Sequence, residues 1–264
     1  MRLITFASGS GGNCALVSGG DTHILIDAGI SMRRIGRALG NLGLGYDDID
    51  GILVTHEHSD HIGGLPMIVK YHPIPVYAPP VVGRRLTYAI PEIGECLRSV
   101  PTEQSFDLGE ISVLAFHTSH DTDESVGYRL ESGESCLGFC TDTGCVTPEM
   151  ERHLARCGAV LLEANHDEMM LRYGPYPVSL KRRILSEHGH MSNELCAAFA
   201  CELAHAGTRS FALGHLSKEN NTPAAALAAV RASLDAAGFA RLPVLVAPAD
   251  GEMEMEVPAC CESD

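Results

Sequence analysis

The stretch Gly51-Ile52-Leu53-Val54-Thr55-His56-Glu57-His58-Ser59-Asp60-His61 places four potential metal ligands directly after an apolar run. The run is typical of a buried strand, whose end would hold the following side chains in place. His56 and His58 lie two residues apart, so a tightly turned backbone can aim both imidazoles at one cation. Asp60 and His61 follow at once and can bind a second cation. A polar loop with neighbouring histidines is the alternative, but this density of ligands after a strand favours a metal site.

Apolar runs that end in polar, potentially ligating residues recur along the chain, near residues 54–56, 116–120 and 139–142. Strands that end in this way favour a site along one edge of a sheet. We expect two divalent metal ions, zinc or manganese, because imidazole and carboxylate ligands accept both. The predicted first site is His56, His58, His120 and Asp142, and the predicted second site is Asp60, His61, Asp142 and His215, with Asp142 as the bridge.

Other residues compete for roles at this site. His117 lies three residues before His120 and is an alternative metal ligand. His166 follows a buried strand and contacts either a metal or the substrate, unless it only hydrogen-bonds to its own loop. His190, in a loop before a predicted helix, is the candidate for holding a phosphate oxygen or protonating a leaving group. We interpret Asp27, at the end of a buried strand, as a carboxylate that orients the histidine loop.

The predicted catalytic residues are Asp60, His190 and His166. A hydroxide held between the two cations would be the nucleophile, with its pKa lowered towards about 7. On a phosphodiester, the same cations would stabilise the charge that develops on the phosphoryl oxygens and on the leaving oxygen.

The composition is that of a soluble globular protein. Of 264 residues, 45% are hydrophobic and 20% are charged, so the chain can bury a sizeable core. The first residues lack the pattern of a signal peptide, and no apolar run approaches the length of a membrane span. The ten cysteines include no CxxC pair. We therefore expect reduced thiols, a cytoplasmic location and no membrane association.

The net charge of −15 argues against broad, non-specific adhesion to nucleic acid, which needs a basic surface. Two bound cations would reverse that field locally, so an acidic chain can still act on a phosphodiester at its site. Basic side chains at residues 33–37 and 181–183 are candidates for phosphate contacts. For the first group, a solvated helix surface is the alternative.

The order of elements predicts one domain over residues 1–264, of the α+β class, with two sheets packed face to face and helices outside. A hairpin is expected between residues 126–130 and 136–140. A final hairpin is expected between residues 243–247 and 252–257. Three helices are predicted to begin after the N-cap residues Ser31, Ser192 and Thr222.

Several motifs together resemble the WalJ/YycJ family of the metallo-β-lactamase fold superfamily. They are Ser8-Gly9-Ser10-Gly11-Gly12-Asn13, Ser119-His120-Asp121, Val126-Gly127-Tyr128, Thr141-Asp142-Thr143-Gly144, Glu163-Ala164-Asn165-His166-Asp167, Gly189-His190-Met191-Ser192-Asn193 and Gly214-His215-Leu216-Ser217-Lys218-Glu219-Asn220-Asn221. The match covers nearly the whole chain. Ribonuclease Z is similar more distantly, through the placement of His190 before His215. The sequence departs from the family at His117, where proline is usual.

The resemblance implies a four-layer αββα sandwich and a bacterial, cytoplasmic, metal-dependent 5′→3′ exonuclease that acts on DNA 5′ ends in association with mismatch-repair proteins. The segment between Asp142 and His215 is too short for the inserted clamp domain that many nucleases of this superfamily carry. The alternative function is a binuclear small-molecule hydrolase acting on a thioester, lactone or β-lactam, which the negative charge and the missing clamp favour. A third possible function is that of a non-hydrolytic regulatory or redox module.

Overall fold

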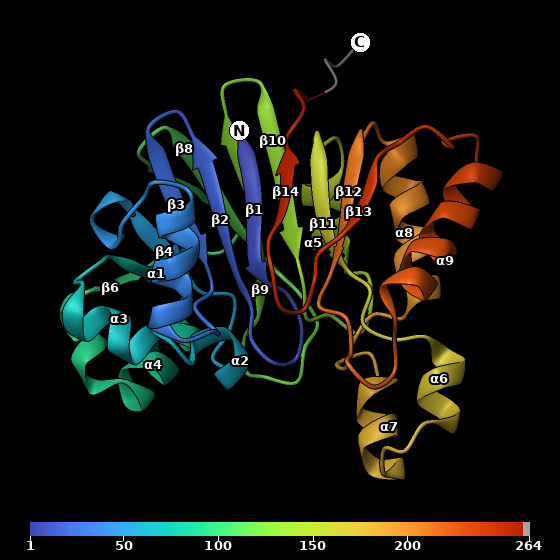
Figure 1. Ribbon diagram of the computed structural model, residues 1–264, viewed down its shortest axis with the longest axis horizontal. Helices are drawn as coiled ribbons and strands as arrows, with labels where there is room; N and C mark the ends of the chain where they lie inside the picture. The colour runs from blue at the N-terminus through green and yellow to red at the C-terminus, as the bar shows by residue number, and fades with distance from the viewer. Residues whose placement is uncertain (261–264) are drawn as a thin grey trace.

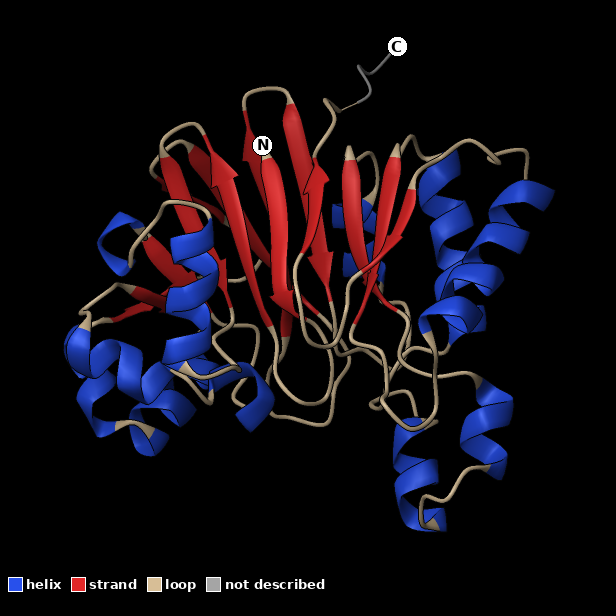
Figure 2. Ribbon diagram, in the orientation of Figure 1, coloured by secondary structure: helices blue, strands red, loops and turns tan. Residues whose placement is uncertain are grey.

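The computed structural model describes residues 1–260, which form two mixed seven-stranded sheets (Figure 2). The last four residues of the predicted domain, 261–264, lie outside the described residues. The first sheet has the order β14 (Met253–Glu256), β1 (Arg2–Ala7), β2 (Cys14–Gly19), β3 (Thr22–Ile26), β4 (Gly51–Leu53), β5 (Val76–Ala78) and β6 (Leu97–Ser99). The second has the order β13 (Val244–Val246), β12 (Ser210–Gly214), β11 (Ala159–Glu163), β10 (Ser135–Cys140), β9 (Val126–Ser132), β8 (Ile111–His117) and β7 (Ser105–Leu108).

Helices cover the outer face of each sheet (Figure 1). Beside the first sheet lie α1 (Met32–Asn41), α2 (Ser59–Ile62), α3 (Leu65–Tyr71), α4 (Pro80–Ala89) and the 3-10 turns η1 (Tyr46–Asp48) and η2 (Pro91–Glu95). Beside the second lie α5 (Pro148–Leu154), α8 (Asn193–His205) and α9 (Pro223–Ala236). Two short helices, α6 (Glu168–Tyr173) and α7 (Val178–Ile184), project beyond the sheets at the bottom of the view (Figure 1).

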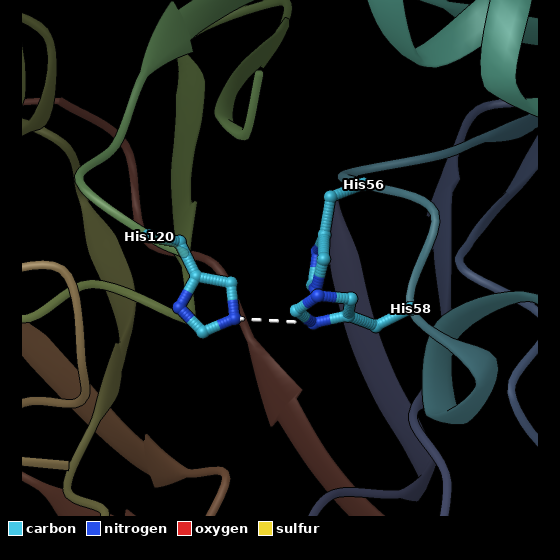
Figure 3. A group of neighbouring side chains, drawn as sticks. All are labelled: His56, His58 and His120. Carbon is cyan, nitrogen blue, oxygen red and sulfur yellow. Dashed lines mark hydrogen bonds between the residues drawn. The ribbon is translucent and has the colours of Figure 1, made fainter. Parts of the chain in front are cut away.

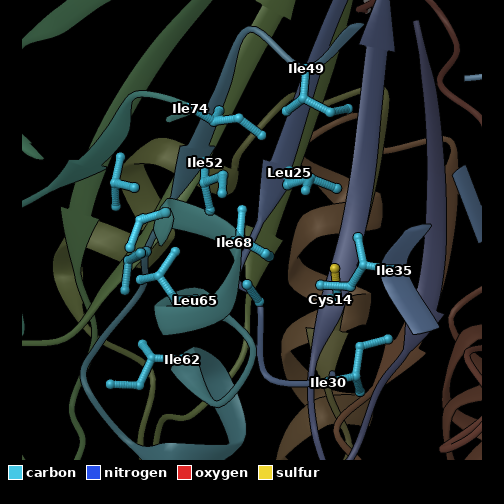
Figure 4. Packing of buried hydrophobic residues seen from close by; sticks show 14 of the residues in the cluster. Cys14, Leu25, Ile30, Ile35, Ile49, Ile52, Ile62, Leu65, Ile68 and Ile74 are labelled. Atoms are coloured by element: carbon cyan, nitrogen blue, oxygen red, sulfur yellow. The ribbon is translucent and has the colours of Figure 1, made fainter. Parts of the chain in front are cut away.

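Strand alternation builds three hydrophobic layers. On β3, Ile24 and Ile26 pack between the sheets, whereas Leu25 faces the helices with Ile35 of α1 and Ile68 of α3 (Figure 4). Tyr128 of β9 lies fully buried between the sheets. A third layer joins the second sheet to α5, α8 and α9. The predicted fold class, a four-layer αββα sandwich, is confirmed.

All three helices begin directly after their predicted N-cap residues, and two of these residues cap the helix through their side chains. The Ser192 hydroxyl accepts a hydrogen bond from the backbone N–H of Leu195 at 3.2 Å. The Thr222 hydroxyl accepts one from the backbone N–H of Ala225 at 3.1 Å, and Pro223 follows it. Ser31 occupies the N-cap of α1 but makes no such side-chain bond. No helix among residues 1–260 is long and apolar enough to cross a membrane.

The predicted hairpin of β9 and β10 is confirmed, but the predicted final hairpin is wrong. β13 pairs in parallel with β12 in the second sheet, whereas β14 pairs antiparallel with β1 in the first. The connecting turn therefore crosses from one sheet to the other. The alternating pattern of β14 correctly predicts a strand with Met255 towards the core, but it carries no information on which strand lies beside it.

The two sheets repeat one arrangement that matters for the site. β3 and β10 each pair antiparallel with one neighbour and parallel with the other. Each leads into an aspartate with a left-handed backbone, Asp27 at φ 60° and Asp142 at φ 57°. His215, after β12, has φ 54°. Three of the five non-glycine residues with positive φ in the described chain thus follow these strands, and such strain concentrates at functional sites.

Candidate metal centre

The seven predicted ligands come together at the edge of the sandwich where β3, β4, β10, β11 and β12 end, near the bottom of Figure 1. Their loops start from both sheets, so the cluster spans the seam between the two halves. Gly29 lets the loops approach, because a Cβ there would lie 1.6 Å from the Asp60 carbonyl oxygen. The cluster consists of His56, His58, Asp60, His61, His120, Asp142 and His215.

The first group contains three histidines. His56 and His58 leave the loop after β4, and His120 faces them from the loop after β8 (Figure 3). Their ligand atoms lie within 4.8 Å of one another, with His120 Nε2 3.3 Å from His58 Nδ1. His117, the alternative ligand, lies exposed at the end of β8 and belongs to none of the candidate metal groups in the described chain.

The second group contains Asp60, His61 and His215. Asp60 Oδ2 lies 3.6 Å from His61 Nε2 and 3.7 Å from His215 Nε2. Asp142 lies between the two groups, with Oδ2 3.3 Å from His61 Nε2 and Oδ1 3.8 Å from His120 Nε2. Oδ1 also lies 3.4 Å from His215 Nδ1, so Asp142 lies within reach of both groups, as expected of a bridge.

Buried polar atoms without partners show that these residues fit divalent metal ions. His56 Nε2, His215 Nε2 and Asp142 Oδ2 are buried, and none has a hydrogen-bond partner in the described chain. Leaving such atoms unsatisfied is costly. All three belong to the cluster, and imidazole nitrogen with carboxylate oxygen is a donor set suited to zinc and manganese. The ligand roles stay predictions.

Asp27 supports the first sheet's side of the cluster, as the sequence predicts. Its fully buried carboxylate accepts hydrogen bonds from His61 Nδ1 at 2.7 Å, from the Thr55 backbone N–H at 2.9 Å and from the Thr55 hydroxyl at 2.9 Å. These bonds fix the orientation of the His61 ring and turn Nε2 towards Asp60 and Asp142.

Glu163 supports the second sheet's side, and no role was assigned to it from the sequence. Its Oε1 accepts from His190 Nδ1 at 2.7 Å and from His215 Nδ1 at 2.8 Å. Its Oε2 accepts from the backbone N–H groups of Thr143 at 2.9 Å and Met191 at 3.2 Å. An acid at the end of a buried strand, the signal that identified Asp27, is also present at Glu163.

The carboxylates of the cluster stabilise the protonated forms of two of its histidines, His61 and His215. Burial opposes a charged His61, but the carboxylates of Asp142 and Asp27 raise its pKa to about 9. Burial likewise opposes charge on His215, and Asp142 and Asp60 raise its pKa well above the usual value. His56, whose burial and histidine neighbours lower its pKa, remains neutral and available as a ligand. The buried carboxylates therefore create a field that favours cations.

His190 and His166, both predicted to be catalytic, differ in placement. The His190 side chain is 20% exposed and lines a cavity of about 270 Å³ together with Asp60, His58 and His215. Burial opposes its charged form, but Glu163 raises its pKa. His166 is buried, and burial lowers its pKa to about 4. It belongs to neither the cavity lining nor the candidate metal groups of the described chain, and neither of its ring nitrogens has a hydrogen-bond partner there, so its role stays a prediction.

Comparison with known proteins identifies the family. Residues 22–215 match the beta-lactamase superfamily domain. The chain is 37% identical over 247 residues to exodeoxyribonuclease YycJ of Bacillus anthracis, covering 90% of this chain and 91% of that protein. It is 36% identical to exodeoxyribonuclease WalJ of Streptococcus pneumoniae serotype 2 strain D39, covering 81% of each.

A solved structure agrees on the fold. The short form of human tRNase Z superposes with a TM-score of 0.67 at 19% identity, covering 98% of this chain and 100% of that one. The distant resemblance to ribonuclease Z is therefore one of fold. The relatives and the domain match together place the chain in the beta-lactamase superfamily, in the same family as the YycJ and WalJ exodeoxyribonucleases.

Proposed function

We propose that the chain is a metal-dependent 5′→3′ exodeoxyribonuclease that binds two divalent metal ions, zinc or manganese, and hydrolyses phosphodiesters at DNA 5′ ends. The observation that carries the proposal is the cluster of seven ligand side chains with three unpartnered buried atoms, opening on a cavity beside His190. The names of the similar relatives support DNA as the substrate.

The metal ions would be held as the ligand groups suggest. His56, His58 and His120 would hold one, Asp60, His61 and His215 the other, and Asp142 would contact both. Bound metals supply a water of lowered pKa and positive charge that stabilises phosphoryl oxygens. Asp27 and Glu163 keep the Nδ1 atoms of His61 and His215 occupied, so Nε2 of each ring stays directed at the cluster.

His190 would hold and move a proton at the substrate. Glu163 accepts the hydrogen bond from His190 Nδ1 and stabilises the charged imidazolium, so Nε2 remains as a donor on the cavity side. A donor in that place can bind a phosphate oxygen or protonate the leaving oxygen. Of the three predicted catalytic residues, the proposal rests on Asp60 and His190, since both line the cavity.

The proposal extends to the cellular location, the link to mismatch repair and the domain organisation. We place the enzyme in the cytoplasm with a link to mismatch repair, and we take the chain to act as one domain without an inserted clamp. Support comes from the resemblance and from the short α6–α7 segment that stands between Asp142 and His215.

The test is degradation of end-labelled linear DNA by purified protein with Mn²⁺ or Zn²⁺. We expect stepwise loss from 5′ ends, abolished by Asp60→Ala and retained by His117→Ala, the exposed histidine outside the cluster. Absence of cleavage by metal-loaded protein contradicts the proposal. Loss of cleavage in His117→Ala as complete as in Asp60→Ala contradicts the assignment of the ligands.

A small-molecule hydrolase is the second candidate, acting on a thioester, lactone or β-lactam. The small cavity and the net charge of −15 favour it. Turnover of such a compound by protein that leaves DNA intact would decide for this candidate.

A further inference from the structure

The helical arm formed by α6, α7 and the residues between and just after them, 168–185, differs in surface chemistry from the rest of the chain. It carries four basic side chains against one acidic side chain, in a protein of net charge −15. Of nine exposed large hydrophobic residues in the described chain, five lie on it: Met169, Met170, Tyr173, Val178 and Leu185. Apolar and basic groups exposed together mark a binding surface for an anionic partner with apolar faces.

Hydrogen bonds hold the two helices of the arm in a fixed arrangement. The Asp167 side chain caps α6 through the backbone N–H of Met170 at 2.8 Å. Lys181 Nζ donates to the carbonyl oxygens of Arg172 at 2.9 Å and Gly174 at 2.7 Å, which ties α7 to the end of α6. The arm therefore holds its side chains in place before any ligand arrives.

The arm also forms one wall of the cavity at the metal cluster. Leu180, Arg183 and Ile184, spaced as one face of α7, line it together with Tyr176, opposite His58, Asp60 and His120. The arm connects to the proposed chemistry through the backbone, since His190 N–H donates to the Ile184 carbonyl oxygen at 3.0 Å. A ligand on this wall is thus placed against the metal ligands and His190.

Arg183 is oriented for a second anion. Its Nε donates to Asp121, and no residue of the described chain pairs with its two terminal nitrogens. An arginine held in this way can direct the free edge of its guanidinium at a phosphate. Arg182, the next residue along the helix, is exposed and does not line the cavity.

We propose that this arm holds the terminal nucleotide of a DNA strand, with its base stacked against Tyr176 and the apolar wall of α7 and a phosphate on Arg183. Stacking of the terminal base on Tyr176 requires that nucleotide to be unpaired, and the cavity of about 270 Å³ lies beside this wall. Aromatic side chains stack on any base, and the arm therefore binds ends without regard to sequence. This inference rests on the proposed nuclease function and adds how the substrate end is held.

The experiment measures binding of a short, fluorescently labelled single-stranded oligonucleotide with nuclease-resistant backbone linkages to the metal-loaded protein, so that binding is read without cleavage. Removing only the base of the 5′-terminal nucleotide should weaken binding to the wild type about tenfold. Tyr176→Leu should bind the intact strand about tenfold more weakly than the wild type does. Removal of the terminal base should then weaken binding to this variant only a little further. Tyr176→Phe keeps the ring and should bind like the wild type.

The arginines provide a matched pair with the same change of charge. Arg183→Gln should weaken binding about fivefold and reduce the salt dependence by about one counterion. Arg182→Gln should change binding by less than about twofold. Equal losses in the two variants would overturn the inference, as would a full tenfold effect of base removal in Tyr176→Leu.

The outcome is separable from that of the proposed function. If metal-loaded wild type degrades DNA but base removal and Tyr176→Leu act independently, the arm does not hold the terminal base and the nuclease proposal stands. If the two changes are coupled but no DNA is degraded, the arm binds nucleic acid and the nuclease proposal fails.

Discussion

Each side of the candidate metal centre has a buried carboxylate that orients a histidine, but the two carboxylates differ in their other contacts. On the first sheet, Asp27 at the end of β3 accepts from the Thr55 N–H and from His61 Nδ1. On the second, Glu163 at the end of β11 accepts from the Thr143 N–H and from His215 Nδ1. Each carboxylate thus orients one histidine of the same metal group through a backbone donor and a ring nitrogen.

The difference lies in what else each carboxylate holds. The remaining hydrogen bond of Asp27 comes from the Thr55 hydroxyl, within an enclosed network. The shared oxygen of Glu163 also accepts from His190, which reaches the cavity. The Asp27 side fixes the orientation of the predicted ligand His61. The Glu163 side links the predicted ligand His215 to His190, the candidate for exchanging a proton with the substrate.

Among the changes that test this contrast, the largest effect is expected at His190. His190→Ala should leave both metal ions bound and lower turnover on DNA about 100-fold or more, because the proton donor at the leaving oxygen is lost. Turnover and metal content by elemental analysis are measured together, with His188→Ala, an exposed neighbour, as control. Parallel loss of metal and activity would make His190 a ligand and remove the contrast between the two sides.

Glu163→Gln should lower turnover about 50-fold. Whichever way the amide lies, its NH₂ group faces N–H donors, either those of Thr143 and Met191 or those of His190 and His215. Turnover at saturating metal is the measurement. A variant that regains full turnover with excess metal would show that Glu163 only retains metal.

Asp27→Asn should weaken metal affinity about tenfold while the fully loaded enzyme keeps turnover within a few-fold of the wild type. The amide disturbs the bond to His61 but touches no group that lines the cavity. Competition with a chromogenic chelator gives the affinity. A loss of turnover at metal saturation as large as in Glu163→Gln would mean that the two sides do not differ.

The smallest effect is expected at Thr55, the member that closes the Asp27 network. Thr55→Val removes a hydroxyl bonded to Asp27 and 3.0 Å from His56 Nδ1, with little change in shape. The free energy of unfolding should fall by about 1 kcal/mol, with turnover nearly unchanged. Urea unfolding checks this, and unchanged stability would show that the bonds from the Thr55 N–H and from His61 Nδ1 suffice to hold Asp27.

The sequence predicts well those features that depend on local pattern. The alternation of Ile24, Leu25 and Ile26 defines a strand between two apolar layers, and the Thr222-Pro223 pair marks a helix start that the structure confirms. The seven predicted ligands lie in loops that follow apolar runs, and the family resemblance favours His120 over His117. The structure brings them together at one edge of the sandwich.

Features that depend on distant pairing were not predictable in this way. The turn before β14 looks like a hairpin locally, yet β14 pairs with β1 because Met255 completes the core between the sheets. Glu163 had the same local signal as Asp27, but its role depends on His190 and His215, which lie 27 and 52 residues away in the chain. The short α7 appeared only as a basic segment.

The pairing of β14 with β1 has a consequence for how the protein is made. Arg2 of β1 pairs with Glu256 of β14, so during synthesis β1 finds this neighbour only after every strand from β2 to β13 has been made. Such distant pairing is slow, and until then β1 presents an open edge that can recruit other nascent chains. Chains that end before Met253 keep that edge, so translation arrested late should yield aggregates rather than a weakened enzyme.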